Sequence, residues 1–187
     1  MLSIPGFSEP VSSLSHLAAA VVFAVLSVSL IARGRGEAQR IVALAVFAFS
    51  CVLLLSLSGL YHLLSPGTAG RSVLLRLDHA AIFVLIAGSF TPVHVILLRD
   101  RWQWHLLAWI WIAAIAALVL KTVYFDAMPA WLGLLMYLGL GWLGLISTTD
   151  SRCAPACASS CRWCGERWLI RSGRGWTLRT GRCSWRA

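Results

Sequence analysis

The chain has 187 residues, of which 59% are hydrophobic and only 12% are charged. A soluble domain of this length is rarely so apolar, which argues against an ordinary soluble enzyme and indicates a membrane protein. The formal net charge of +9 comes mainly from residues 151–187, which carry eight arginines and one glutamate. It therefore indicates no nucleic-acid partner for the main body of the chain.

Five apolar segments predict five transmembrane helices, over about residues 14–32, 41–64, 78–98, 104–120 and 131–146. In the third segment, the small residues Gly88 and Thr91 favour close helix packing, and Pro92 is expected to kink the helix near Gly88. The predicted fold class is an all-α, polytopic transmembrane helix bundle. It covers residues 1–150, lies among membrane lipids and is followed by a tail over residues 151–187.

Polar residues gather where the second predicted helix ends and the third begins. Ser58 and His62 are four residues apart, so they share one face of a helix. A turn-forming run at 65–70 separates them from Asp78, so both helices reach this link at the same membrane face. Ionisable residues at such a place predict a functional site.

Three motifs in this region resemble those of the hemolysin III family, part of the wider group that includes the progestin and adiponectin receptors and the alkaline ceramidases. They are Ser-x-x-x-His at 58–62, Leu-Asp-His at 77–79 and Ile-Ala-Gly-Ser-Phe-Thr-Pro at 86–92. Glu9, Ser12 and His16 also resemble the family's entry to its first helix. The resemblance covers about residues 8–146.

The resemblance implies seven transmembrane helices in a bacterial plasma membrane, with a zinc site near one membrane face. Carried over to this chain, it makes His62 the first zinc ligand, Asp78 the catalytic partner of the metal-bound water and Ser58 a supporting residue. The other two zinc ligands would be a His-x-x-x-His pair in the last helix. That pair and two further apolar helices are missing, since no histidine follows His105. We therefore expect an incomplete ligand set in this chain and no enzymatic activity.

Residues 151–187 are rich in arginine, cysteine and tryptophan, and two explanations for them stay open. One is a frameshift near codons 147–155 of a GC-rich gene, which turns leucine, alanine and glycine codons into codons for those residue types. On that reading the tail is disordered. The other is a metal module formed by Cys153, Cys157, Cys161 and Cys164, whose spacing can supply four thiolates.

Three classes of function follow for the family-like part. The first is a zinc-dependent lipid amide hydrolase with a ceramide-like substrate, in which Asp78 assists proton transfer. The second is a receptor-like membrane sensor with structural zinc, and the third is a cytolysin. A fourth possibility assigns His62 and Asp78 a purely structural contact between helices. The sequence does not indicate an oligomeric state.

Overall fold

A computed structural model describes residues 9–97, 102–149, 168–172 and 175–179. The chain divides into two compact units, residues 1–149 and residues 150–187. Each unit is described by itself.

The described residues of the first unit form five long helices, and all five are long and apolar enough to cross a membrane. This confirms the predicted polytopic all-α bundle with five spans. The elements are α1 (Pro10–Ala32), α2 (Ala38–Leu63), α3 (Ala69–Pro92), the π-helix η1 (Val93–Leu97), α4 (Trp102–Val123) and α5 (Ala130–Thr149).

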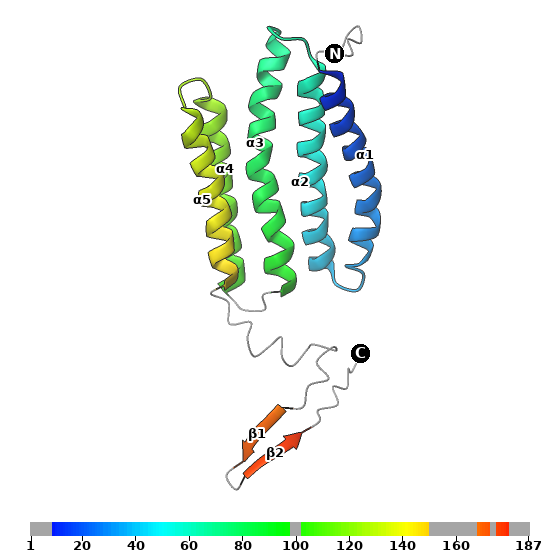
Figure 1. Cartoon of the computed structure of the whole chain (residues 1–187), viewed down its shortest axis with the longest axis vertical. Coiled ribbons are helices and arrows are strands. Elements are labelled where there is room, and N and C mark those ends of the chain that lie inside the picture. Colours follow the sequence, from blue (N-terminus) through cyan, green and yellow to red (C-terminus); the bar gives the residue numbers. More distant parts are fainter. Residues whose placement is uncertain (1–8, 98–101, 150–167, 173–174, 180–187) are drawn as a thin grey trace. The chain divides into compact units, whose positions relative to one another are not determined.

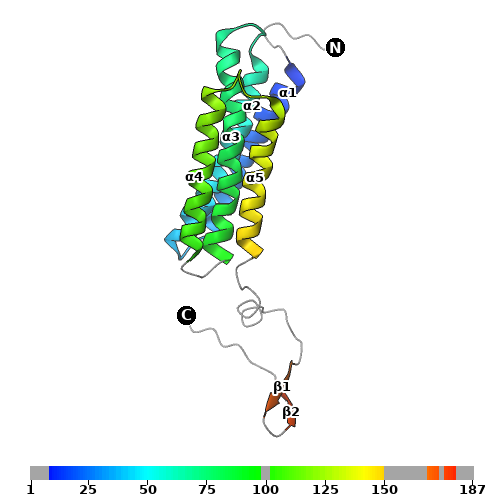
Figure 2. The same cartoon turned by 90° about the vertical axis from the view of Figure 1, so that its left-hand side faces the viewer.

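Helix α3 is the centre of the bundle. It packs against α2, α4 and α5, whereas α1 packs mainly against α2. Figures 1 and 2 show successive helices running in opposite directions, with α1 and α2 beyond one side of α3 and α4 and α5 on its other sides. At one end of the bundle α1 and α3 begin and α2 and α4 end; this end is called the His62 end. The opposite end, which holds η1, is called the His94 end.

The third helix begins at Ala69, nine residues before the predicted start at Asp78. Thr68 caps it, because the Thr68 hydroxyl oxygen accepts a hydrogen bond from the Arg71 backbone N–H at 3.3 Å. The helix can include Arg71 and Arg76 because each forms an ion pair with an acidic residue, Glu9 and Asp126 respectively. The prediction of a polar link up to residue 77 was therefore wrong.

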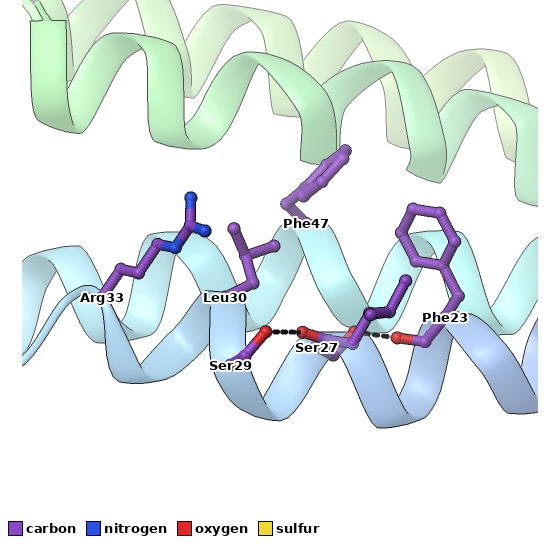
Figure 3. A pocket seen from close by; sticks show the side chains of 7 residues that line it. Phe23, Ser27, Ser29, Leu30, Arg33 and Phe47 are labelled. Atoms are coloured by element: carbon purple, nitrogen blue, oxygen red, sulfur yellow. Dashed lines mark hydrogen bonds between the residues drawn. The ribbon is translucent and has the colours of Figure 1, made fainter.

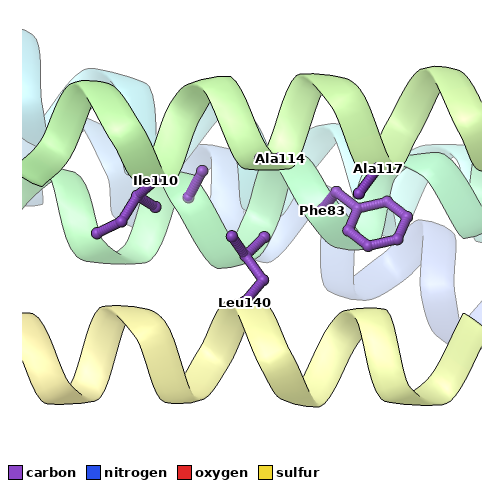
Figure 4. Close-up of a cluster of buried hydrophobic side chains, with 6 residues drawn as sticks. Phe83, Ile110, Ala114, Ala117 and Leu140 are labelled. Atoms are coloured by element: carbon purple, nitrogen blue, oxygen red, sulfur yellow. The ribbon is translucent and has the colours of Figure 1, made fainter.

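The buried core lies where α3, α4 and α5 meet (Figure 4). Small residues allow the close approach that drives helix association in a membrane. On the other side of α3, a Cβ atom added at Gly88 would lie 2.9 Å from the Ser50 Cβ of α2. The core side chains are those of Phe83, Ala87, Ile110, Ala114, Ala117 and Leu140.

Pro92 marks a change in helix geometry. Proline has no backbone N–H to donate to the preceding turn, so the regular α-helical pattern cannot continue through it. The chain responds by forming the π-helical turn η1 directly after Pro92. A π-turn in this position places His94 inside the bundle, where it is fully buried.

The described part of the second unit is a short antiparallel hairpin, which the sequence pattern did not predict. Strand β1 (Trp168–Ser172) pairs with β2 (Gly175–Arg179), with Trp168 opposite Arg179 and Ser172 opposite Gly175. The predicted cysteine module lies outside the described residues.

Candidate functional site

His62 lies in the last turn of α2, where its ring meets the carboxylate of Glu9. The His62 Nδ1 is 2.7 Å from Glu9 Oε2. The contact joins residues 53 positions apart in the sequence and is reinforced by the backbone, because the Glu9 N–H donates to the His62 carbonyl at 3.2 Å. The entry to α1 is thus fastened to the end of α2.

Glu9 uses its second carboxylate oxygen for Arg71. The Arg71 Nη2 donates to Glu9 Oε1 at 2.8 Å, and its Nη1 donates to the Leu64 carbonyl at 2.7 Å. The guanidinium also lies 4.7 Å from the centre of the Tyr61 ring. Arg71 therefore links α3 to both the last residues of α2 and the entry to α1.

These contacts favour the ionised form of Glu9. The Arg71 guanidinium, and after it the His62 ring, holds the pKa of the Glu9 carboxyl below its usual value of 4.5. An ionised carboxylate only accepts hydrogen bonds, so the His62 Nδ1 is the donor in this pair. A neutral His62 then carries its lone pair on Nε2, for which no partner occurs among the described residues.

A histidine held at Nδ1 by a carboxylate is a common arrangement for metal ligands. The carboxylate fixes the tautomer and the ring orientation and makes the other nitrogen a better donor to a metal. The predicted ligand role of His62 is compatible with this geometry. No measurement of metal binding tests it, so it stays a prediction.

Asp78 lies at nearly the same height in the bundle as His62. Since Ser50 of α2 and Gly88 of α3 face each other, they mark a common level. His62 lies 12 residues beyond Ser50, and Asp78 lies 10 residues from Gly88 toward the same end of the bundle. At about 1.5 Å per residue, the two differ by only about 3 Å along the helix axes.

Helix geometry also places Ser58 and Asp78 on one side of the α2–α3 pair. Each is turned by about 80° from the line of contact marked by Ser50 and Gly88. Both side chains are half-buried. Neither of them forms a hydrogen bond or an ion pair within the part of the chain that the structure describes.

The described residues do not contain a complete metal centre. No group of three or more His, Cys, Asp or Glu residues among them could hold a metal ion. His79 is turned to the Phe125 ring, 5.4 Å between centroids, and His94 lies at the opposite end of the bundle. The catalytic roles assigned to Asp78 and Ser58 stay predictions.

Sequence reasoning missed Arg71 and Tyr61. A signal for Arg71 was present in the sequence: it follows His62 by only nine residues, across the turn-forming link, and so lies at the same membrane face. It was not used because Arg71 was assigned to the link before the third helix. The resemblance did point to Glu9 and His16, and both contact His62. The Glu9 carboxylate meets the His62 Nδ1, and the ring centroids of His16 and His62 are 5.6 Å apart.

A separate cavity of about 210 Å³ lies between α1 and α2, toward the His94 end (Figure 3). Its walls are mostly apolar, with Phe47 from α2 facing Phe23 and Leu30 from α1. Arg33 also lines it. Because it is remote from Glu9 at the other end of α1, it is not part of the His62 site.

Comparison with known proteins decides the family. Residues 7–173 match the haemolysin-III-related family, which is most of the chain and includes part of the tail. The chain belongs to the haemolysin-III-related family. It is thus an integral, multi-pass membrane protein, and the predicted family membership is confirmed.

Two bacterial members of this family show how much of it the chain represents. Hemolysin-3 of Bacillus cereus is 36% identical over 112 residues, which are 60% of this chain and 50% of that protein. The Hemolysin-3 homolog of Bacillus subtilis (strain 168) is 32% identical over 124 residues, 66% of this chain and 57% of that protein. The chain spans about half the length of these curated relatives. No solved structure matches it.

Proposed function

We propose that the His62 end carries one side of the active centre of a zinc-dependent, hydrolase-like membrane protein that acts on a lipid amide. The observation behind this proposal is the Glu9–His62 contact, which engages Nδ1 and leaves Nε2 for a metal. Asp78 adds a carboxylate at the same level, which suits proton transfer at a lipid headgroup.

The residues present fit one zinc ligand but not a complete site. A catalytic zinc typically needs three protein ligands, and the described residues offer one imidazole nitrogen with its carboxylate partner. On this proposal, the missing ligands come from outside the described residues. The described part of the chain is then inactive by itself.

A chimera tests the proposal. Residues 1–146 of this chain are joined to the part of Bacillus cereus Hemolysin-3 that follows its matched region. We expect one zinc per chain, and hydrolysis of a ceramide with a fluorescent acyl chain. Asp78→Asn should abolish turnover but retain the zinc, whereas His62→Ala should lose both. A chimera that binds zinc without turnover would refute the hydrolase and favour the receptor-like sensor.

The names of the relatives favour a second candidate, a cytolysin, since both are called hemolysins. We propose the same chimera for this test, added to red cells at matched protein concentrations. Release of haemoglobin that persists in the His62→Ala and Asp78→Asn variants would support the cytolysin. The hydrolase proposal predicts no release at concentrations that give full amide hydrolysis.

A further inference from the structure

Lys121 is the only lysine in the chain, and it lies in the last turn of α4 at the His62 end. The residue is only 6% exposed. An ammonium ion is strongly hydrated, so burying it is unfavourable unless an anion or hydrogen-bond acceptors replace the lost water. Buried charges in membrane helices are usually paired and functional.

The described residues do not supply such a replacement. Lys121 forms no hydrogen bond or ion pair with any of them, and its Nζ lies 4.8 Å from the centre of the Phe125 ring. The Arg76 guanidinium lies over the same ring at 5.7 Å. Two cations therefore share one aromatic ring. Asp126 forms an ion pair with Arg76 at 2.6 Å, whereas Lys121 has no ion-pair partner among the described residues.

The first turn of α5 adds further positive potential beside Lys121. A Cβ atom added at Gly133 would lie 3.1 Å from the Lys121 Nζ, so the glycine makes room for the ammonium group. The backbone N–H groups of Ala130 and Trp131 make no hydrogen bond within the described residues. Free N–H groups and the positive end of the helix dipole both attract anions.

Few negative groups face this position. The Asp126 side chain is 79% exposed and is committed to Arg76. The nearby His79 ring is held at Nδ1 by the Leu75 carbonyl, 2.8 Å away, and packs its edge on Phe125. Asp78 precedes His79 in α3 and has no hydrogen-bond partner among the described residues. No carboxylate of the described residues is in contact with the Lys121 ammonium group.

We infer that Lys121, Arg76 and the first turn of α5 form a binding site for a phosphoryl oxyanion. Arginine, lysine and helix N-termini are the groups that proteins combine to bind phosphate oxygens. Lys121 lies two residues before the end of a membrane-spanning helix, which is the depth of phospholipid headgroups. The same chemistry would accept a free phosphate ion.

Native mass spectrometry of the full chain in a neutral, phosphate-free detergent tests this inference. Three probes are added separately: inorganic phosphate, dioleoyl phosphatidylglycerol, and dioleoylglycerol, which lacks a phosphate. We expect one phosphatidylglycerol per chain and no specific binding of dioleoylglycerol. Binding of inorganic phosphate as well would identify the oxyanion alone as sufficient, whereas its absence would identify a lipid headgroup as the ligand.

Charge variants assign the binding to this site. Lys121→Met should weaken phosphatidylglycerol binding by about tenfold or more, because it removes a charged hydrogen-bond donor. Arg35→Gln removes one positive charge at the opposite end of the bundle and should leave binding unchanged. If Lys121→Met does not fold, Arg76→Gln, a change at a partly exposed residue, provides the same test. The inference is overturned if neither phosphate nor phosphatidylglycerol binds, or if the Lys121 and Arg76 variants bind as the unchanged protein does.

Discussion

His62 and His94 lie at opposite ends of the bundle and are held in different ways. Both rings use Nδ1, for Glu9 in one case and for the Phe90 carbonyl, 2.9 Å away, in the other. The difference is at Nε2. In His94 this nitrogen is 2.9 Å from the Ser147 Oγ, in a fully buried position, whereas in His62 it has no partner among the described residues. His94 is thus a structural link, and His62 is a ligand candidate.

The type of residue alone therefore does not predict a metal site. Both histidines occur near a helix end in an apolar chain, and both have a hydrogen-bond acceptor at Nδ1. What separates them is whether the second nitrogen is used inside the protein. Substitutions at the two ends should therefore affect stability and metal binding differently.

The largest expected effect is on stability at the His94 end. His94→Ala should lower the free energy of unfolding by about 2–3 kcal/mol, because it leaves a cavity and removes the link between η1 and α5. His62→Ala should cost less than about 1 kcal/mol, since Arg71 still holds Glu9. Reversible unfolding in mixed micelles measures both, with Leu97→Ala as a control at an exposed position. Equal losses for the two histidines would contradict the comparison.

A smaller effect is expected where α2 and α3 set their relative height. Gly88→Ala introduces a Cβ against Ser50 and should destabilise the bundle by about 1–2 kcal/mol. Gly139→Ala is the matched control, because nothing lies within 4 Å of an added Cβ there. The control should be neutral or slightly stabilising in the same unfolding assay. If both changes are neutral, Ser50 and Gly88 do not fix the level of Asp78 relative to His62.

The smallest effect is the pH dependence of the Glu9 contacts. The pKa of Glu9 is lower in the folded protein than its ordinary value of 4.5. The unfolded chain therefore binds the proton more readily, and the stabilisation is fully present above about pH 4.5 and is lost as the pH falls through the folded value. Unfolding midpoints between pH 6 and pH 3 should show a decrease that is reduced in Glu9→Gln. An identical decrease in that variant would assign the acid sensitivity to other carboxylates.

The sequence predicted the five helices well because each apolar run is long and is bounded by charged or turn-forming residues. It predicted the start of α3 badly, since Arg71 and Arg76 read as parts of a polar link. Their charges are satisfied by Glu9 and Asp126, which are far away in the sequence. Such pairs are formed only after the helices assemble, so hydropathy cannot reveal them.

The candidate site was likewise predicted in part: the residues on one helix were found, but their partners from other helices were not. The spacing of Ser58 and His62 within α2 follows directly from helix periodicity, and the family resemblance drew attention to Glu9. The role of Glu9 as the partner of His62 depends on how the entry to α1 folds back onto α2, which no local pattern specifies. The burial of Lys121 likewise depends on the packing of α4 against Gly133 of α5.

The most direct test of the account is zinc binding by the full chain, measured by competition with a chromophoric chelator. We expect well under one tightly bound zinc per chain, together with weak zinc binding that is reduced in both His62→Ala and Glu9→Gln. His105→Ala, a change at the opposite end, should leave it unchanged. One tightly bound zinc that survives His62→Ala but is lost in Cys161→Ala would contradict the account, because the metal would then belong to the tail.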